Sequence, residues 1–168
     1  MASLRRSRNG KPSALKKTGK PSRRIEREVA FQILYSLSFS PDADEAALHS
    51  AFANSPDLEA RGLSPEPQGF TWDLVRGVWL NRAEMDAVIA RYSQNWRVER
   101  MGRIELTILR IGMYEVLFAP EPLNVPPKVA INEAVELAKN FGDQSARSFV
   151  NGILDAAVRE MERQPVYF

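Results

Sequence analysis

Apolar residues recur every three or four positions along most of this chain, and prolines and glycines separate the segments in which they do so. Ile25, Val29, Ile33 and Leu37, for example, step by four, which places them on one face of a helix. No segment shows the strict alternation of apolar and polar residues that is typical of a half-buried strand. The sequence therefore predicts an all-α fold, a compact helical bundle of six to seven helices.

Prolines, glycines and capping residues predict where each helix begins and ends. Residues 54–69 contain three prolines and two glycines and are expected to form a loop. Gly142 is expected to end one helix and Asp143 to cap the next. The expected helices run from Arg23 until Pro41, from about Asp44 to Ala53, from a Thr71 cap to about Gln94, from about Ile104 until Pro120, from Pro127 to Phe141, and from Asp143 onward.

Positive charge is concentrated at the N-terminus. Residues 1–22 hold seven lysines and arginines and no acid; since the whole chain carries +2, residues 23–168 carry −5. Residues 1–22 also contain almost nothing apolar to bury, so we expect a disordered basic arm before a single helical domain over residues 23–168. Such an arm indicates a polyanionic partner, although a tail that only aids solubility has the same composition.

Catalytic and metal-binding signatures are missing from the sequence. It has no cysteine and a single histidine, His49, and it lacks a phosphate-binding glycine-rich loop, an HExxH motif and a nucleophile elbow. We therefore predict a protein that is not an enzyme and that has no cofactor and no metal. No apolar run is long enough to cross a membrane and no secretory signal is present, so a cytoplasmic location is expected.

The first predicted helix opens with arginines, which bind phosphate bidentately and stack on bases. Arg24 and Arg27, with Lys20 just upstream, are expected to project together on the side opposite the apolar stripe. A solvated face partly neutralised by nearby glutamates is the alternative reading. The candidate RNA-binding residues of this region are Lys20, Arg23, Arg24 and Arg27, followed by Gln32 and Tyr35.

Three segments in register, RRIEREVAFQILYSL, ILRIGMYEVL and VPPKVAINEAVELAKNFGDQSARSFVNGILD, closely resemble the NusB family of bacterial transcription antitermination factors. The resemblance covers roughly Arg23 to Arg159. It implies two packed three-helix subbundles and binding of a short single-stranded RNA element, boxA. It also implies a protein partner, the ribosomal protein that doubles as NusE, and loading onto an RNA polymerase antitermination complex that supports ribosomal RNA transcription.

The resemblance extends the set of candidate residues, because it implies that the tract Gln144–Asn151 lies near the RNA path. Phe149 is expected to be exposed there, and Arg147 to add a phosphate contact. Tyr92 is a further candidate for base stacking, with core packing as the default for every aromatic residue named. Asn132 and Asn151 are expected to be architectural first and RNA-contacting second, with Gly152 allowing a neighbouring helix to approach Asn151.

Two other functions remain open at this level. NusB-like domains also occur fused to ribosomal RNA cytosine methyltransferases, so the chain has the features of a stand-alone RNA-binding module of that kind. A helical adaptor that binds only proteins is the second alternative. The sequence leaves open whether the protein is a monomer or a homodimer.

Overall fold

The structure is a computed structural model that describes residues 19–94, 96–120, 123 and 125–164. Most of the predicted basic arm lies outside these residues. Within them every regular element is helical, which confirms the all-α prediction. The elements are α1 (Arg23–Leu37), α2 (Glu45–Ala53), α3 (Pro56–Ala60), α4 (Phe70–Leu80), α5 (Arg82–Tyr92), the 3-10 turn η1 (Val98–Arg100), α6 (Arg103–Met113), the π-helical turn η2 (Tyr114–Phe118), α7 (Pro127–Phe141) and α8 (Gln144–Arg163).

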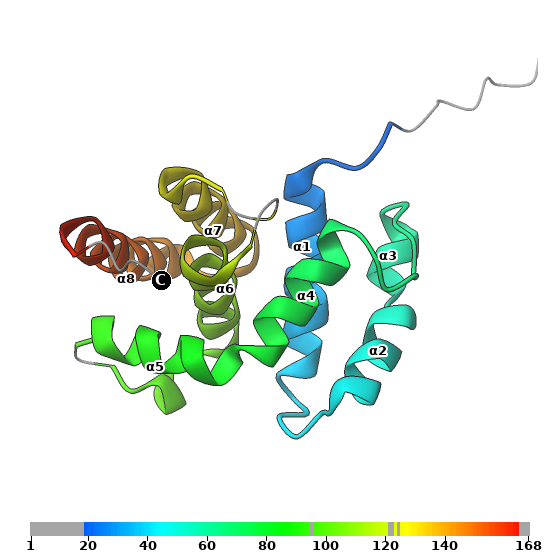
Figure 1. Cartoon of the computed structure of the whole chain (residues 1–168), viewed down its shortest axis with the longest axis horizontal. Coiled ribbons are helices and arrows are strands. Elements are labelled where there is room, and N and C mark those ends of the chain that lie inside the picture. The colour runs from blue at the N-terminus through cyan, green and yellow to red at the C-terminus, as the bar shows by residue number, and fades with distance from the viewer. Residues whose placement is uncertain (1–18, 95, 121–122, 124, 165–168) are drawn as a thin grey trace, which may run out of the picture.

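The helices form two groups, as Figure 1 shows. Helices α1 to α4 lie together on one side, with α1 packed on α2, α3 and α4. Helices α5 to α8 form the other side, where α6 packs on α5, α7 and α8. Helix α6 also contacts α1 and α4, so it joins the two groups. The start of α1, where the basic arm enters the domain, lies beside α7.

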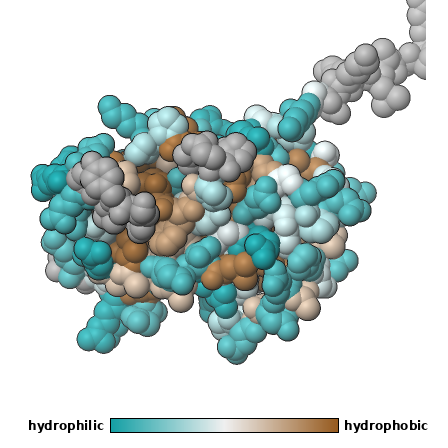
Figure 2. Space-filling model, viewed as in Figure 1, coloured by the Kyte–Doolittle hydropathy of each residue, from teal (hydrophilic) through white to brown (hydrophobic). Residues whose placement is uncertain are grey.

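Helix α6 supplies the centre of the core, as its apolar sequence predicts. Ile108, Leu109, Ile111 and Met113 are all buried. Gly112 allows α8 to approach closely, because a Cβ at this position would lie 2.8 Å from a Leu154 methyl carbon. Polar residues cover most of the face in Figure 2, and the apolar residues visible there gather mainly over the α5–α8 half. None of the described helices combines the length and the apolar character needed to span a membrane.

Three local predictions differ from the structure. The helix expected over residues 71–94 is interrupted at Asn81, whose side-chain amide donates to the Gly77 carbonyl oxygen (2.8 Å) at the end of α4. Thr71 does not cap it; Thr71 is buried in the first turn, and Gly69, with φ of 90°, precedes the helix. The expected loop 54–69 contains α3, which forms because Pro56 favours a first helical turn and Leu58 is buried.

The junction between α7 and α8 confirms the predicted cap. The Asp143 carboxylate accepts hydrogen bonds from the Ala146 amide (3.0 Å) and the Ser145 hydroxyl (2.6 Å). These bonds lower the pKa of Asp143 because they stabilise the ionised carboxylate. Gly142 ends α7 with extended backbone, and a Cβ there would lie 2.7 Å from the Ala146 Cβ. The corner therefore requires a glycine for space and not for a left-handed φ.

Candidate nucleic-acid interface

Arginines surround the first turn of α1. The Ser22 hydroxyl accepts a hydrogen bond from the Ile25 amide (3.3 Å) and thereby fixes where the helix begins. Lys20, Arg23 and Arg24 are exposed at this end of the helix. The Arg23 guanidinium lies 2.8 Å from the Glu26 carboxylate and 4.3 Å from the centre of the Phe70 ring. Lys20, Arg23 and Arg24 are thus exposed cations at this helix start, and their contact with RNA stays a prediction.

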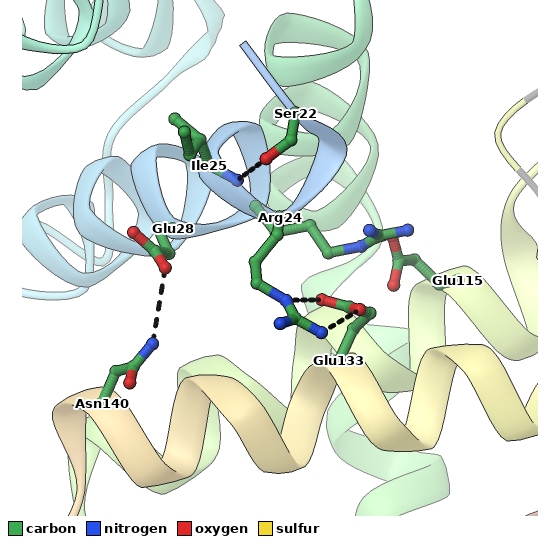
Figure 3. A network of polar contacts seen from close by, with 8 residues as sticks. Ser22, Arg24, Ile25, Glu28, Glu115, Glu133 and Asn140 are labelled. Atoms are coloured by element: carbon green, nitrogen blue, oxygen red, sulfur yellow. Dashed lines mark hydrogen bonds and ion pairs between the residues drawn. The ribbon is translucent and has the colours of Figure 1, made fainter.

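Arg24 is held in a fixed direction by a glutamate of α7. Its Nε and Nη2 atoms donate to the two carboxylate oxygens of Glu133, at 3.2 and 3.0 Å (Figure 3). The Arg24 side chain nevertheless remains 55% exposed, whereas Glu133 is mostly covered. A planar guanidinium with free edges is suited to a phosphate. A phosphate at Arg24 would therefore bind the guanidinium edge that Glu133 leaves free, close to the negative charge of that carboxylate.

Arg27 does not project with Lys20 and Arg24, so this part of the sequence-based prediction is wrong. Its side chain is buried, and its Nε donates to Glu115 Oε1 at 2.8 Å. Burial raises the pKa of Glu115, and the Arg27 charge opposes this shift. The sequence held a signal for this position, because Arg27 precedes Ala30 by three residues and Leu34 by seven. Those spacings place it on the buried face of α1.

The middle of α1 carries the next two candidates, Gln32 and Tyr35, which are both half-buried. The Tyr35 ring lies 5.9 Å from Phe31 and 5.2 Å from Phe39, so it belongs to a row of aromatic rings that runs from α1 into the turn after it. Phe39, at one end of the row, is 58% exposed. The Tyr35 ring is therefore only partly available for stacking on a base.

The candidates of α5 and α8 lie in different surroundings. Tyr92 is half-buried; burial and then hydrogen bonding to Glu160 raise its pKa. Arg147 and Phe149 are also half-buried. The Phe149 ring meets Trp96 edge-on, with 6.0 Å between ring centres, and both rings line a cavity at the start of α6 and α8. Trp96 was not among the predicted site residues, because its position next to Phe149 follows only from the fold.

Both asparagines are exposed, contrary to the architectural role expected for them. Asn132 lies on the outer side of α7 and Asn151 on that of α8. A Cβ added to Gly152 would meet nothing within 4 Å, so the predicted close approach of a helix to Asn151 is wrong. Both amides therefore remain candidates for contact with a ligand.

Comparison with known proteins identifies relatives over most of the chain. The NusB family model matches residues 24–159. Transcription antitermination protein NusB of Nitratidesulfovibrio vulgaris (strain Hildenborough) is 56% identical over 144 residues, which cover 86% of this chain and 92% of that protein. The protein of the same name from Myxococcus xanthus is 43% identical over 134 residues, covering 80% of this chain and 92% of the relative.

Solved structures agree with these matches. T. maritima NusB superimposes with a TM-score of 0.66 at 32% identity, covering 84% of this chain and 94% of that one. A crystal structure of antitermination factors NusB and NusE in complex with double-stranded RNA gives a TM-score of 0.62 at 23% identity, covering 82% and 96%, which is a likeness of fold. The chain belongs to the NusB family.

Proposed function

We propose that this protein is a transcription antitermination factor that binds single-stranded boxA-type RNA together with the NusE ribosomal protein. It acts on elongating RNA polymerase through binding and not through catalysis. The observation that carries this proposal is its 56% identity to proteins named transcription antitermination protein NusB, over 92% of their length. That coverage favours the antitermination role over a module related to methyltransferases.

The start of α1 supports RNA as one ligand. Lys20, Arg23 and Arg24 are exposed where the basic arm joins the domain, so the helix continues the positive charge of the arm. Charge of this kind binds phosphates without reading sequence. Base contacts by residues such as Phe149 are needed to select a particular RNA.

The charge of the domain supports a basic protein as the second ligand. Residues 23–168 carry −5, which makes much of the domain a poor surface for RNA but a suitable one for a positively charged ribosomal protein. A NusB of the same fold is known in a complex with NusE and RNA. The two ligands are thus expected to bind one small domain at the same time.

Transcription through a terminator tests the proposed function. A template with a boxA-type leader is transcribed in the presence of NusE-type protein and the other factors of the complex, with or without this chain. We expect read-through to depend on the chain and on an intact leader. Equal read-through without the chain, or with a scrambled leader, would reject the antitermination role.

Removal of residues 1–22 is expected to weaken the salt dependence of RNA binding. For single strands, the slope of log K against log salt is about −0.7 for each phosphate contact. The truncated chain should therefore have a shallower slope but keep much of any sequence preference. Fluorescence anisotropy at several salt concentrations measures both quantities, and an identical slope in the two chains would show that the arm does not contact RNA.

Two substitutions in the Arg24–Glu133 pair are expected to change RNA affinity in opposite directions. Arg24→Ala should weaken RNA binding and make the salt slope shallower by about 0.7. Glu133→Gln should strengthen binding, because it removes a negative charge beside the Arg24 guanidinium. Arg76→Ala is a matched control, since Arg76 of α4 forms an exposed ion pair with Glu45 of α2. Each arginine change should alter stability by no more than about 0.5 kcal/mol. If all three variants bind RNA with the wild-type affinity, Arg24 is only a solvated side chain and does not contact RNA.

A further inference from the structure

A cavity beside Trp96 combines aromatic walls with polar groups, and its lining residues belong neither to the basic arm nor to α1. It encloses about 330 Å³ between η1, the start of α6 and the start of α8. Trp96, Met101 and Phe149 give it apolar walls, and Arg100, Glu105 and Ser145 supply polar groups. Its volume lies at the lower end of the range for small-molecule sites, so it has room for one planar group.

Trp96 is unusual because 59% of its surface is exposed, whereas the other two tryptophans of the chain are buried. Its ring is not part of the core, and it lies edge-on to the ring of Phe149, with 6.0 Å between the ring centres. In an edge-on pair the edge of one ring covers one face of the other, so the pair itself leaves at least one face of each ring free for a third. The cavity thus offers aromatic faces of the kind on which unpaired bases stack.

The charges near the cavity match a nucleotide better than an apolar peptide. Arg97 and Arg100 are exposed, and within the described part of the chain neither of them forms an ion pair with a carboxylate. These guanidinium groups are available to a phosphate at the rim. Glu105 lines the cavity itself, where a carboxylate repels phosphate but accepts hydrogen bonds from an amino group.

Gly102 allows Glu105 to take this position. A Cβ on Gly102 would collide with the Glu105 carboxylate, which lies over the glycine at the beginning of α6. The lack of a side chain at Gly102 therefore leaves room for the carboxylate beside the cavity.

We propose that this cavity binds one unstacked base of single-stranded RNA, that Trp96 and Phe149 stack on it, and that Glu105 favours bases with an exocyclic amino group. Adenine, cytosine and guanine carry such a group, and uracil does not. The assignment rests on the proposed function, since it adds a specificity site to an RNA-binding protein. It makes Trp96 and Glu105 sequence-reading residues, whereas Arg24 contacts the phosphate backbone.

Binding of the full chain to single-stranded oligonucleotides of about 12 nucleotides, all adenylate, all cytidylate or all uridylate, tests the assignment. Trp96→Ala should weaken binding of the first two by about 5- to 150-fold, which corresponds to about 1–3 kcal/mol for one stacked base. Trp96→Phe should retain most of the affinity. Leu80→Ala, which truncates an exposed apolar side chain on α4, should have no effect.

Two further readouts distinguish base binding from a change in fold. Adenylate and cytidylate should quench the fluorescence of exposed Trp96, and the quenching should disappear in Trp96→Phe. Glu105→Gln should reduce the preference for adenylate and cytidylate over uridylate. An equal preference in wild type and Glu105→Gln would overturn the role of Glu105.

The possible failures can be told apart. Unchanged affinity of Trp96→Ala, with Arg24→Ala weakened, would overturn the base site and leave the proposed RNA-binding function intact. If the wild-type chain binds no RNA, with or without NusE-type protein, the proposed function fails and the base site fails with it.

Discussion

Replacing Arg27 with alanine is expected to lower the free energy of unfolding by about 3–5 kcal/mol, the usual cost of leaving a buried charge without its partner. The variant removes the guanidinium that lies 2.8 Å from Glu115, and both side chains of the pair are almost inaccessible to solvent. Small domains have about 5–15 kcal/mol of stability, so this one change should remove a large part of it. Urea denaturation followed by circular dichroism measures the loss.

Lower pH should partly rescue the Arg27→Ala variant. Burial already raises the pKa of Glu115, and without Arg27 the shift should increase. A carboxyl whose folded pKa exceeds its unfolded value near 4.3 binds protons more tightly in the folded state, so stability falls as pH rises above that value. The deficit of the variant relative to wild type should therefore be smaller at about pH 5 than at about pH 7.5.

Two control variants separate the stability cost of an unpaired buried charge from the cost of losing an arginine contact. Arg24→Ala removes an arginine from the same helix, but its pair with Glu133 is exposed on the arginine side, so its cost should stay within about 0.5 kcal/mol. The double variant Arg27→Met, Glu115→Leu removes both charges and should recover much of the stability. A stability of Arg27→Ala within about 1 kcal/mol of wild type would mean that water reaches Glu115.

The helices were predictable from the sequence where the spacing of apolar residues agrees with the positions of prolines, glycines and capping residues. Asp143 caps α8 as expected, because a short side-chain acceptor just before an apolar periodic segment bonds a free amide of the first helical turn. Asn81 gave no such signal: the apolar phase continues past it, although its side-chain bond to the Gly77 carbonyl oxygen marks the break between α4 and α5. Local side-chain bonds of this type compete with the helix in a way that periodicity does not report.

The candidate site was predictable only in part, because exposure depends on what lies opposite each residue. Arg24 and Arg27 are three residues apart and chemically identical, yet α7 places Glu133 near one at the surface and the turn after α6 places Glu115 near the other in the core. The fold likewise brings Trp96 to Phe149 across 53 positions of sequence. Contacts of this kind carry no periodic signature, so the sequence identified the helix start but not its internal acids or the Trp96 cavity.

RNA and the NusE-type protein are expected to bind this chain with positive coupling of about 1–3 kcal/mol, or roughly a 5- to 150-fold gain in affinity. The expectation rests on the proposed function and on the distribution of charge. The domain carries −5 beyond its basic arm, so it repels much of an RNA strand until a basic protein covers part of that surface. With the partner bound, we expect the strand to meet less exposed negative charge.

Isothermal titration calorimetry measures the coupling in both directions. RNA is titrated into this protein alone and into its complex with the NusE-type protein, and the partner is titrated into this protein with and without RNA. Because coupling is reciprocal, the factor by which the partner tightens RNA must equal the factor by which RNA tightens the partner. Arg24→Ala should lower the affinity for RNA by the same factor with and without the partner, since it removes a phosphate contact and leaves the coupling unchanged. Equal RNA affinities with and without a folded, bound partner would mean that the two proteins do not read RNA jointly.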